Sequence, residues 1–167
     1  MLRIRAVRDD AEDLARTLAW ANDPDVITHS FSRTGELKGD EHAKWFKERV
    51  KLGSWWILEE TEPMAPLGQI RVDWEPIPGF EPEAGVISLM VDQQHRGRGL
   101  GRYMLRSLSD HFDSREDARY LVGLIKLGNS RSVRLFDGCG YAIVASPGLI
   151  IAVKQVGGKS GRHQAKA

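Results

Sequence analysis

A glycine-rich turn between a strand pattern and a helix pattern carries residues that can bind an anion. The segment Gln94-His95-Arg96-Gly97-Arg98-Gly99-Leu100-Gly101 follows the apolar, β-branched run 86–91 and precedes apolar residues at helical spacing. The first N–H groups of a helix lack intrahelical partners, and glycines let the backbone approach a ligand closely. Three arginines add mobile positive charge around the same anion: Arg96, Arg98 and Arg102. The turn is therefore predicted to hold a pyrophosphate.

Other glycine-rich motifs fit this turn less well. The dinucleotide fingerprint requires G-x-G-x-x-G, whereas the spacing here is Gly97-x-Gly99-x-Gly101. A P-loop needs Gly-Lys-Ser/Thr at its end, which does not follow. RGG-like RNA-binding segments are repetitive and disordered, and this one is short and flanked by ordered patterns. A purely structural tight turn is the remaining alternative.

A second segment has the pattern of a capped helix. It begins at Asn129 and follows the strand-like run 119–125. Asn129 is a good N-cap with Ser132 three residues on, and Gly138 or Gly140 supplies the helix stop.

Together the two segments resemble the GCN5-related N-acetyltransferase (GNAT) superfamily. The acyl-CoA motif of that superfamily, Gln/Arg-x-x-Gly-x-Gly/Ala, is matched by Gln94, Gly97 and Gly99. Its later motif, Asn-x-x-Ala/Ser-x-x-Leu-Tyr/Phe-x-x-x-Gly-Phe/Tyr, is matched by Asn129, Ser132, Leu135, Phe136, Gly140 and Tyr141. Both motifs occur in the order typical of the family, with a strand pattern between them.

Length and charge describe a small protein with no strong polyelectrolyte character. The chain has 167 residues, of which 24 are basic and 23 acidic, and a formal net charge of +1. This length favours one domain, predicted over 1–155, followed by a disordered basic tail over 156–167. The charge balance implies no nucleic-acid partner, and no apolar run approaches a membrane span. The single cysteine, Cys139, and a charged N-terminus predict a cytoplasmic protein without disulfide or signal peptide; no metal site is predicted.

Apolar periodicity and turn residues predict an alternating order of elements. Strands are expected over 2–7, 55–59, 67–74, 86–92, 120–125, 142–145 and 149–154. Helices are expected after Asp10 to about Asn22, and over 40–52, 99–112 and 129–138. The segment with Pro76, Pro78, Gly79 and Pro82 is predicted to be a loop, and Ser30-Phe31-Ser32 a short polar connection.

This order resembles the α/β (α+β) fold of the superfamily, a mixed and mostly antiparallel sheet flanked by helices. The resemblance implies that strands 4 and 5, at 86–92 and 120–125, splay apart at one end. It also implies acetyl-CoA as co-substrate, with pantetheine along Leu89-Met90-Val91, bonded to the backbone of Leu89 and Val91. The turn 94–101 would hold the pyrophosphate, and Asn129, Ser132 and Phe136 would complete the cofactor contacts.

The resemblance implies that an amine attacks a thioester. Such a reaction can use a general base for the amine and a general acid for the leaving thiolate. For the base, His42 ranks first because imidazole titrates in the right range, and a solvated helix position is its alternative. Ser88 could relay a proton through water. Asp92 is a third candidate, with capping of the following turn as its structural alternative.

The acid is harder to assign, because Phe136 stands where many members of the superfamily have a tyrosine. Tyr141 or Cys139 could substitute, or the thiolate could leave without help. The resemblance further implies the backbone N–H of Val91 as donor to the oxyanion.

The acceptor is expected to be the primary amine of a small molecule, with a nucleotide-linked amino sugar as the first choice. The segments 20–26, 30–31 and 41–46 resemble a branch of the superfamily that acts on nucleotide-linked amino sugars, although its usual arginine is Ala21 here. Five tryptophans could stack on a base or sugar, with core packing as the alternative for at least three of them. A ribosomal-protein or peptide N-terminus is the rival acceptor.

Two further hypotheses, one on the function and one on the oligomeric state, stay open at this point. A domain that binds acyl-CoA without catalysis and regulates a partner is the rival from another class of function. Dimers are common in the superfamily, so a homodimer is one expectation for this chain.

Overall fold

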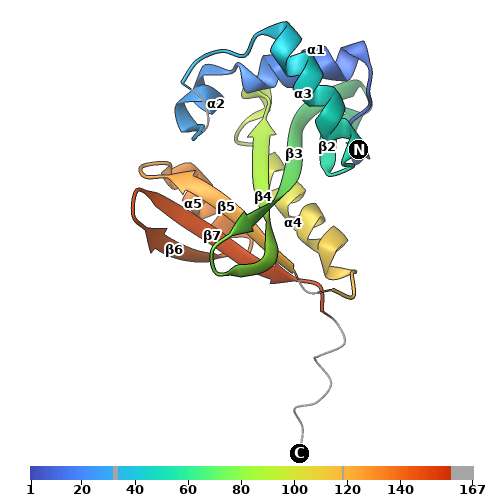
Figure 1. Cartoon of the computed structure of the whole chain (residues 1–167). Coiled ribbons are helices and arrows are strands. Elements are labelled where there is room, and N and C mark those ends of the chain that lie inside the picture. The colour runs from blue at the N-terminus through green and yellow to red at the C-terminus, as the bar shows by residue number, and fades with distance from the viewer. Residues whose placement is uncertain (32–33, 118, 159–167) are drawn as a thin grey trace, which may run out of the picture. The chain divides into compact units, whose positions relative to one another are not determined.

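A computed structural model describes residues 1–31, 34–117 and 119–158 of the chain. The helices are α1 (Ala11–Ala21), α2 (Pro24–His29), α3 (Gly39–Lys51), α4 (Leu100–Asp113), α5 (Ser130–Asp137) and the 3-10 turn η1 (Gln93–His95). The strands are β1 (Leu2–Ala6), β2 (Trp55–Thr61), β3 (Met64–Ile77), β4 (Phe80–Val91), β5 (Arg119–Lys126), β6 (Ala142–Ser146) and β7 (Leu149–Val156) (Figure 1).

The strands form a mixed sheet in the order β1-β2-β3-β4-β5-β7-β6. The β1–β2, β2–β3, β5–β7 and β6–β7 pairs are antiparallel, whereas β4 and β5 are parallel. The β4–β5 ladder covers only Ala84–Val86 against Tyr120–Val122, so 87–91 of β4 continue past it. The predicted fold class, a mixed and mostly antiparallel sheet flanked by helices, is confirmed, whereas the splaying of strands 4 and 5 stays a prediction.

The chain divides into two compact units. Unit 1 consists of Met1–Val72 and Ser88–Gly101, and unit 2 of Asp73–Ile87 and the chain from Arg102 onward. Strands β3 and β4 and helix α4 contribute residues to both units. The single domain over 1–155 stays a prediction.

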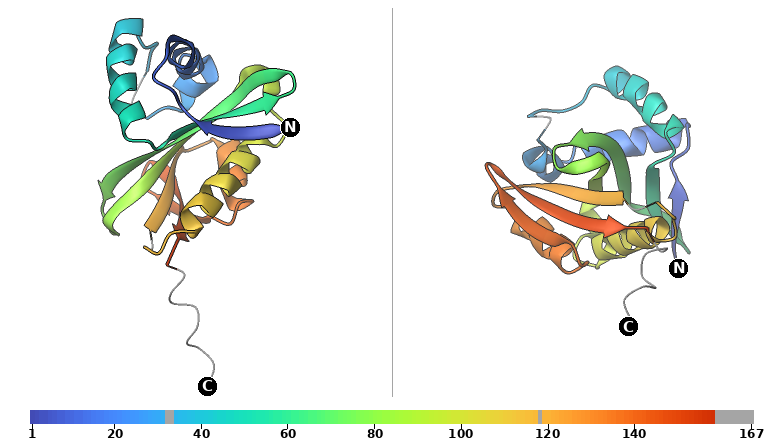
Figure 2. Two further views of the ribbon diagram at one scale, coloured as in Figure 1. Left: turned by 90° about the vertical axis from the view of Figure 1, so that its right-hand side faces the viewer. Right: turned by 60° about the horizontal axis from the view of Figure 1, so that its bottom comes forward.

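In unit 1, helices α1, α2 and α3 lie on one side of β1, β2 and the first part of β3 (Figure 2). Helix α1 begins where the Asp10 carboxylate accepts a hydrogen bond from the N–H of Asp13, as the predicted cap requires. Helices α1 and α3 bury their apolar faces against the sheet. The resulting core cluster is Val7, Trp20, Phe46, Trp55 and Ile57, with Leu14, Trp45, Val50 and Met90 packed against it.

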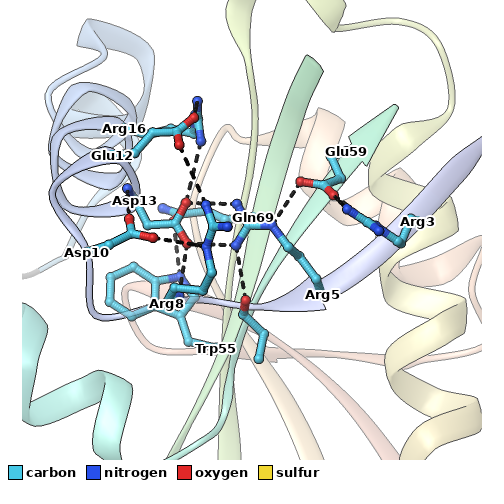
Figure 3. A network of polar contacts seen from close by, with 11 residues as sticks. Arg3, Arg5, Arg8, Asp10, Glu12, Asp13, Arg16, Trp55, Glu59 and Gln69 are labelled. Atoms are coloured by element: carbon cyan, nitrogen blue, oxygen red, sulfur yellow. Dashed lines mark hydrogen bonds and ion pairs between the residues drawn. The ribbon is translucent and has the colours of Figure 1, made fainter. Parts of the chain in front are cut away.

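A buried ionic network joins β1, β2 and the first turn of α1. The side chain of Asp13 is fully buried and accepts two hydrogen bonds from the Arg5 guanidinium, at 2.6 and 2.8 Å. Arg5 also donates to Glu59 at 2.8 Å, Arg3 bonds the same carboxylate, and the N–H of Arg8 donates to Asp13 at 2.8 Å (Figure 3). Every buried charge in this group has a partner of opposite sign, which is the condition for burying charge at all.

In unit 2, α5 contacts β5, β6 and β7 (Figure 1), and its Phe136 is buried. Phe136 lies edge-on to Tyr141, with ring centroids 5.0 Å apart. Its ring tip rests over the backbone of Gly123 in β5, where a Cβ atom would come within 2.5 Å of Phe136 Cζ. Glycine is therefore required at this position by close approach.

We expect Gly123→Ala to lower the free energy of unfolding by about 1–3 kcal/mol, because the buried ring must shift to admit a methyl group. Denaturant unfolding measures this change. Gly39→Ala is the matched control, since its Cβ would meet only Leu18 Cδ2 at 3.9 Å. Equal stability of the two variants would contradict the close packing of Phe136 on β5.

The predicted loop at 76–82 is wrong. Strand β3 runs to Ile77 and β4 starts at Phe80, so only Pro78 and Gly79 turn between them. Prolines are excluded from sheets where their missing N–H is needed. Among the described residues, the β2–β3 ladder reaches Arg71 and the β4–β5 ladder begins at Ala84, so Pro76 lies beyond the β2–β3 ladder.

Two smaller features also differ from expectation. Residues 24–29 form α2, because Asp23 caps its start by accepting from the N–H of Asp25 and Pro24 occupies the first turn. The predicted tail from 156 begins too early, since Val156 ends β7 and is buried. The rest of the predicted tail, 159–167, and Ser32 lie outside the described residues.

Candidate active site

The predicted pyrophosphate turn lies in unit 1 between β4 and α4. Gly97 and Gly99 both have left-handed backbones, with φ of 82° and 76°. A Cβ at either position would meet no atom within 4 Å, so the backbone of the turn is open. Helix α4 starts directly afterwards at Leu100. Successive N–H groups in such a turn, next to a helix N-terminus, form an anion-binding concavity, so these residues fit a pyrophosphate.

Asp92 holds the start of this turn in place. Its carboxylate accepts hydrogen bonds from Trp20 Nε1 at 3.0 Å, from the N–H of Gln94 at 3.0 Å, and contacts His95 Nδ1 at 3.1 Å. Burial alone would raise the pKa of Asp92, but the hydrogen bonds from Trp20, Gln94 and His95 outweigh it and hold the pKa below its ordinary value. Asp92 therefore caps η1, which is the structural role that the sequence offered as the alternative to a role as base.

Arg96 is fixed rather than mobile, in contrast to the prediction. Its guanidinium pairs with Asp23 at 2.8 Å and with Asp25 at 3.3 Å, and its Nε donates to the carbonyl of Val91 at 3.2 Å. Both carboxylates belong to the start of α2, the helix that the sequence did not predict. Because its donors already have strong partners, Arg96 positions the turn against α2.

The other two arginines differ in setting. Arg98 is nearly half exposed, at 47%, and approaches Glu60 only at 3.8 Å, so its charge is the mobile one at the turn. Arg102 belongs to unit 2, where its Nη2 lies 3.1 Å from the Cβ position of Gly138 at the end of α5. A cation at a helix C-terminus complements the helix dipole.

Strand β4 presents its side chains to alternate faces. Met90 packs against the core cluster of unit 1, and its sulfur accepts a hydrogen bond from Gln69 Nε2 at 3.5 Å. Ser88 shares that face, and Arg71 Nη2 lies 3.4 Å from its hydroxyl. The sequence analysis did not single out Arg71. Positions 69, 71 and 73 of the buried strand β3 are all polar, and this alternation could have indicated that the three side chains share one face of the sheet.

His42 lies inside unit 1, not on a solvated helix surface. It is 2% exposed, its ring packs against Trp45 and Phe46, and its Nε2 lies 3.1 Å from Thr17 Oγ1. An acceptor amine cannot contact this ring without rearrangement of α1 or α3. The position therefore does not favour His42 as a direct base.

The remaining predicted residues lie in unit 2. Asn129 caps α5, because its side-chain oxygen accepts from the N–H of Ser132 at 3.2 Å. Tyr141 is 2% exposed, and burial raises its pKa to about 12. Burial likewise raises the pKa of the Cys139 thiol. The Tyr141 hydroxyl and the Cys139 thiol are thus neutral and buried, and the Tyr141 ring lies against the Phe136 ring.

Strand β4, the open glycine turn and helix α4 follow one another in the order predicted for an acetyltransferase fold. The acetyltransferase (GNAT) domain model matches residues 1–142, and the chain belongs to this GNAT family. It is an N-acetyltransferase that uses acetyl-CoA, which confirms the predicted class and co-substrate. None of the helices in the described ranges is long and apolar enough to span a membrane.

Two relatives and one solved structure illustrate the similarity. The chain is 29% identical over 124 residues to the L-methionine sulfoximine/L-methionine sulfone acetyltransferase of Salmonella typhimurium, covering 74% of this chain and 67% of the relative. It is 28% identical to the L-amino acid N-acyltransferase MnaT of Escherichia coli, covering 75% and 69%. The fold matches the spermidine N-acetyltransferase of Vibrio cholerae, in complex with CoA and spermine, with a TM-score of 0.72, 13% identity, and coverage of 93% and 94%.

Proposed function

We propose that this chain acetylates the primary amine of a small molecule, with the turn 94–101 holding the pyrophosphate of acetyl-CoA. The observation that carries this proposal is the pair of open, left-handed glycines, Gly97 and Gly99, at the start of α4. Residues 87–91 of β4 continue beyond the β5 ladder, which supports hydrogen bonds between pantetheine and the backbone of Leu89 and Val91. The side chain of Met90 is committed to the core, so its contribution would be through backbone.

The chain's own residues have little covalent chemistry to perform. Acetyl-CoA supplies an activated acetyl group on a sulfur leaving group, and a free thiol has a pKa of only about 8.5. A dedicated acid is therefore dispensable, which agrees with Phe136 in place of a tyrosine and with the enclosure of Tyr141 and Cys139. Alignment of two bound substrates accounts for much of the rate in such a reaction.

For the amine proton, we retain Ser88 as the relay to water. Its side chain is half-buried on the face of β4 that carries Met90, one residue before Leu89. His42 would act only through the packing of α3, because Thr17, Trp45 and Phe46 surround its ring. The N–H of Val91 is the proposed donor to the developing oxyanion, and the bond from Arg96 to the Val91 carbonyl steadies that end of the strand.

The acceptor is proposed to be a small amine rather than a nucleotide-linked amino sugar. Of the five tryptophans, Trp20 and Trp55 are 7% and 2% exposed and belong to the core, so these two indoles are not accessible for stacking on a sugar or base. The two relatives at 28–29% identity are named for amino acids and amino-acid analogues. A protein N-terminus remains the alternative acceptor within the same chemistry.

A thiol-release assay with acetyl-CoA tests the proposal. The acceptors are free amino acids, their carboxamides, polyamines, aminoglycosides, nucleotide-linked amino sugars and peptides with free N-termini, each against a reaction without acceptor. We expect release with small free amines, at least about tenfold above the rate with peptides. Release with peptides alone, or with no acceptor at all, would overturn the proposal.

A further inference from the structure

Two side chains at the junction of α1 and α2 reach the segment proposed to hold the pyrophosphate. Trp20, near the end of α1, donates its indole N–H to Asp92 Oδ2 at 3.0 Å. Asp23, the N-cap of α2, accepts a hydrogen bond from Arg96 Nη2 at 2.8 Å, across 73 residues of sequence. All four residues belong to unit 1. The helices α1 and α2 are therefore attached to this segment at two points.

The carboxylate of Asp23 serves two elements at once. Its Oδ1 accepts from the N–H of Asp25 at 2.8 Å and caps α2, while its Oδ2 accepts from the Arg96 guanidinium. Arg96 also lies 3.3 Å from an Asp25 oxygen and donates its Nε–H to the Val91 carbonyl at 3.2 Å. The side chains of Asp23 and Arg96 are 14% and 24% exposed, so salt screens this pair less than it screens a surface pair. The pair ties position 96 of the turn to the first turn of α2.

This attachment lies beside the part of the turn with the greatest backbone freedom. Gly97 follows Arg96 directly, and glycine has the widest choice of backbone conformations. A segment that must be ordered when a ligand binds loses conformational entropy, and a segment that is already held in place loses less. By fixing Arg96, Asp23 therefore lowers the entropic cost of binding an anion at the turn.

Helix α2 is not held by a buried face. It is six residues long, and none of its residues is buried. Short helices are marginal in water and depend on tertiary contacts for their stability. Arg96 supplies two such contacts, one to Asp23 and one to Asp25. Whatever steadies Arg96 must therefore steady α2 as well.

We propose that Asp23 is a positioning residue for acetyl-CoA, and that α2 and bound acetyl-CoA stabilise one another through Arg96. Because it takes the turn 94–101 as the pyrophosphate site, this role of Asp23 rests on the proposed function. Thermodynamic linkage makes the effect reciprocal: the factor by which an ordered α2 strengthens acetyl-CoA binding is also the factor by which acetyl-CoA favours the ordered α2. Asp23 acts on the turn and takes no part in acetyl transfer.

The sign of one substitution separates positioning from simple charge effects. Asp23→Asn keeps an oxygen that can cap α2, because asparagine and aspartate are equally good N-caps, but it loses the charge that faces Arg96. By charge alone, removal of a carboxylate near an anion site would strengthen acetyl-CoA binding. Loss of positioning weakens it instead. We expect the Kd for acetyl-CoA, measured by isothermal titration calorimetry, to rise about five- to tenfold.

Asp10→Asn is the matched control. Asp10 also caps a helix, α1, by accepting from the N–H of Asp13 at 2.8 Å, and it also pairs with an arginine, Arg8, at 3.0 Å. In the described part of the chain, the polar contacts of Asp10 and Arg8 go to the start of α1 and not to the turn 94–101. This variant should bind acetyl-CoA as the wild type does, and thermal unfolding verifies that both variants are folded.

A double-mutant cycle tests whether Asp23 acts through Arg96. Arg96→Gln should weaken acetyl-CoA binding at least as much as Asp23→Asn does, and the double variant should bind no more weakly than Arg96→Gln alone. Hydrogen exchange of the amides of α2 measures the reciprocal effect. Saturating acetyl-CoA should slow this exchange about fivefold or more in the wild type and clearly less in Asp23→Asn.

Three results would overturn the inference: equal or tighter acetyl-CoA binding by Asp23→Asn, additive effects of the two substitutions, or exchange of α2 that acetyl-CoA leaves unchanged. Gly97→Glu separates these results from a failure of the proposed function. If Gly97→Glu binds acetyl-CoA as tightly as the wild type, the turn is not the pyrophosphate site and both proposals fail. If Gly97→Glu loses binding while Asp23→Asn keeps it, only the role of Asp23 is wrong.

Discussion

Asp13→Ala is expected to lower the free energy of unfolding by about 3–5 kcal/mol, a large share of the stability of a small domain. The variant leaves the half-buried Arg5 guanidinium without the carboxylate that accepts two of its hydrogen bonds, and the N–H of Arg8 without its acceptor. A guanidinium keeps its proton throughout the ordinary pH range, so Arg5 cannot avoid the penalty by becoming neutral. Urea unfolding followed by circular dichroism measures the change.

Glu12→Ala is the matched control on the same helix turn. Its carboxylate is 65% exposed and pairs with Arg16 at 2.9 Å, so its loss should cost less than about 1 kcal/mol. If both variants lose the same stability, the buried network of Figure 3 does not hold β1 to α1.

The same network predicts how stability depends on pH. Burial alone would raise the pKa values of Asp13 and Glu59, but hydrogen bonds from arginines outweigh burial and lower both below 3.8 and 4.5, respectively. A carboxyl with a lowered folded pKa stabilises the fold above its unfolded pKa and loses that contribution as the pH falls through the folded value. Wild-type stability should therefore fall steeply below those two values, and Asp13→Ala should show a shallower acid slope.

Gly97→Glu is expected to weaken acetyl-CoA binding more than about 100-fold, equivalent to about 2.7 kcal/mol, while the fold persists. The new carboxylate would lie in the open turn at the start of α4 and repel the pyrophosphate, where the helix dipole otherwise favours an anion. Isothermal titration calorimetry with acetyl-CoA measures the affinity, and thermal unfolding verifies the fold.

Any residue but glycine is strained at a positive φ, so the control must carry the same strain. Gly148→Glu does so, because Gly148 has φ 79° in the β6–β7 turn and equal space around its Cβ position. It should bind acetyl-CoA as the wild type does. Equal affinities of the two variants would remove the turn 94–101 from the cofactor site.

Features encoded within a few consecutive residues were predictable from the sequence. The caps at Asp10 and Asn129 and the strand–turn–helix at 86–112 all appear where expected, because each depends on contacts between residues close in the chain. The family follows from the same local signals, since Gln94, Gly97 and Gly99 lie within one turn. Strand positions were recovered as well, but not their full lengths, since length depends on which neighbours are paired.

Contacts between distant segments were decided by the tertiary structure. Arg96 looked like a mobile cation until α2 supplied Asp23, 73 residues away in sequence. The imidazole of His42 is of a type that can act as a catalytic base, but the packing of α1 on α3 encloses it beside Thr17, 25 residues away. The contacts of Arg71 with Trp55 and Ser88 form only because the sheet brings these residues together. Arg5 likewise obtains its ion pairs only when Asp13 and Glu59 come close to it in the fold. The physical reason is that a side chain's charge, access and partners depend on neighbours in space, and local periodicity does not specify them.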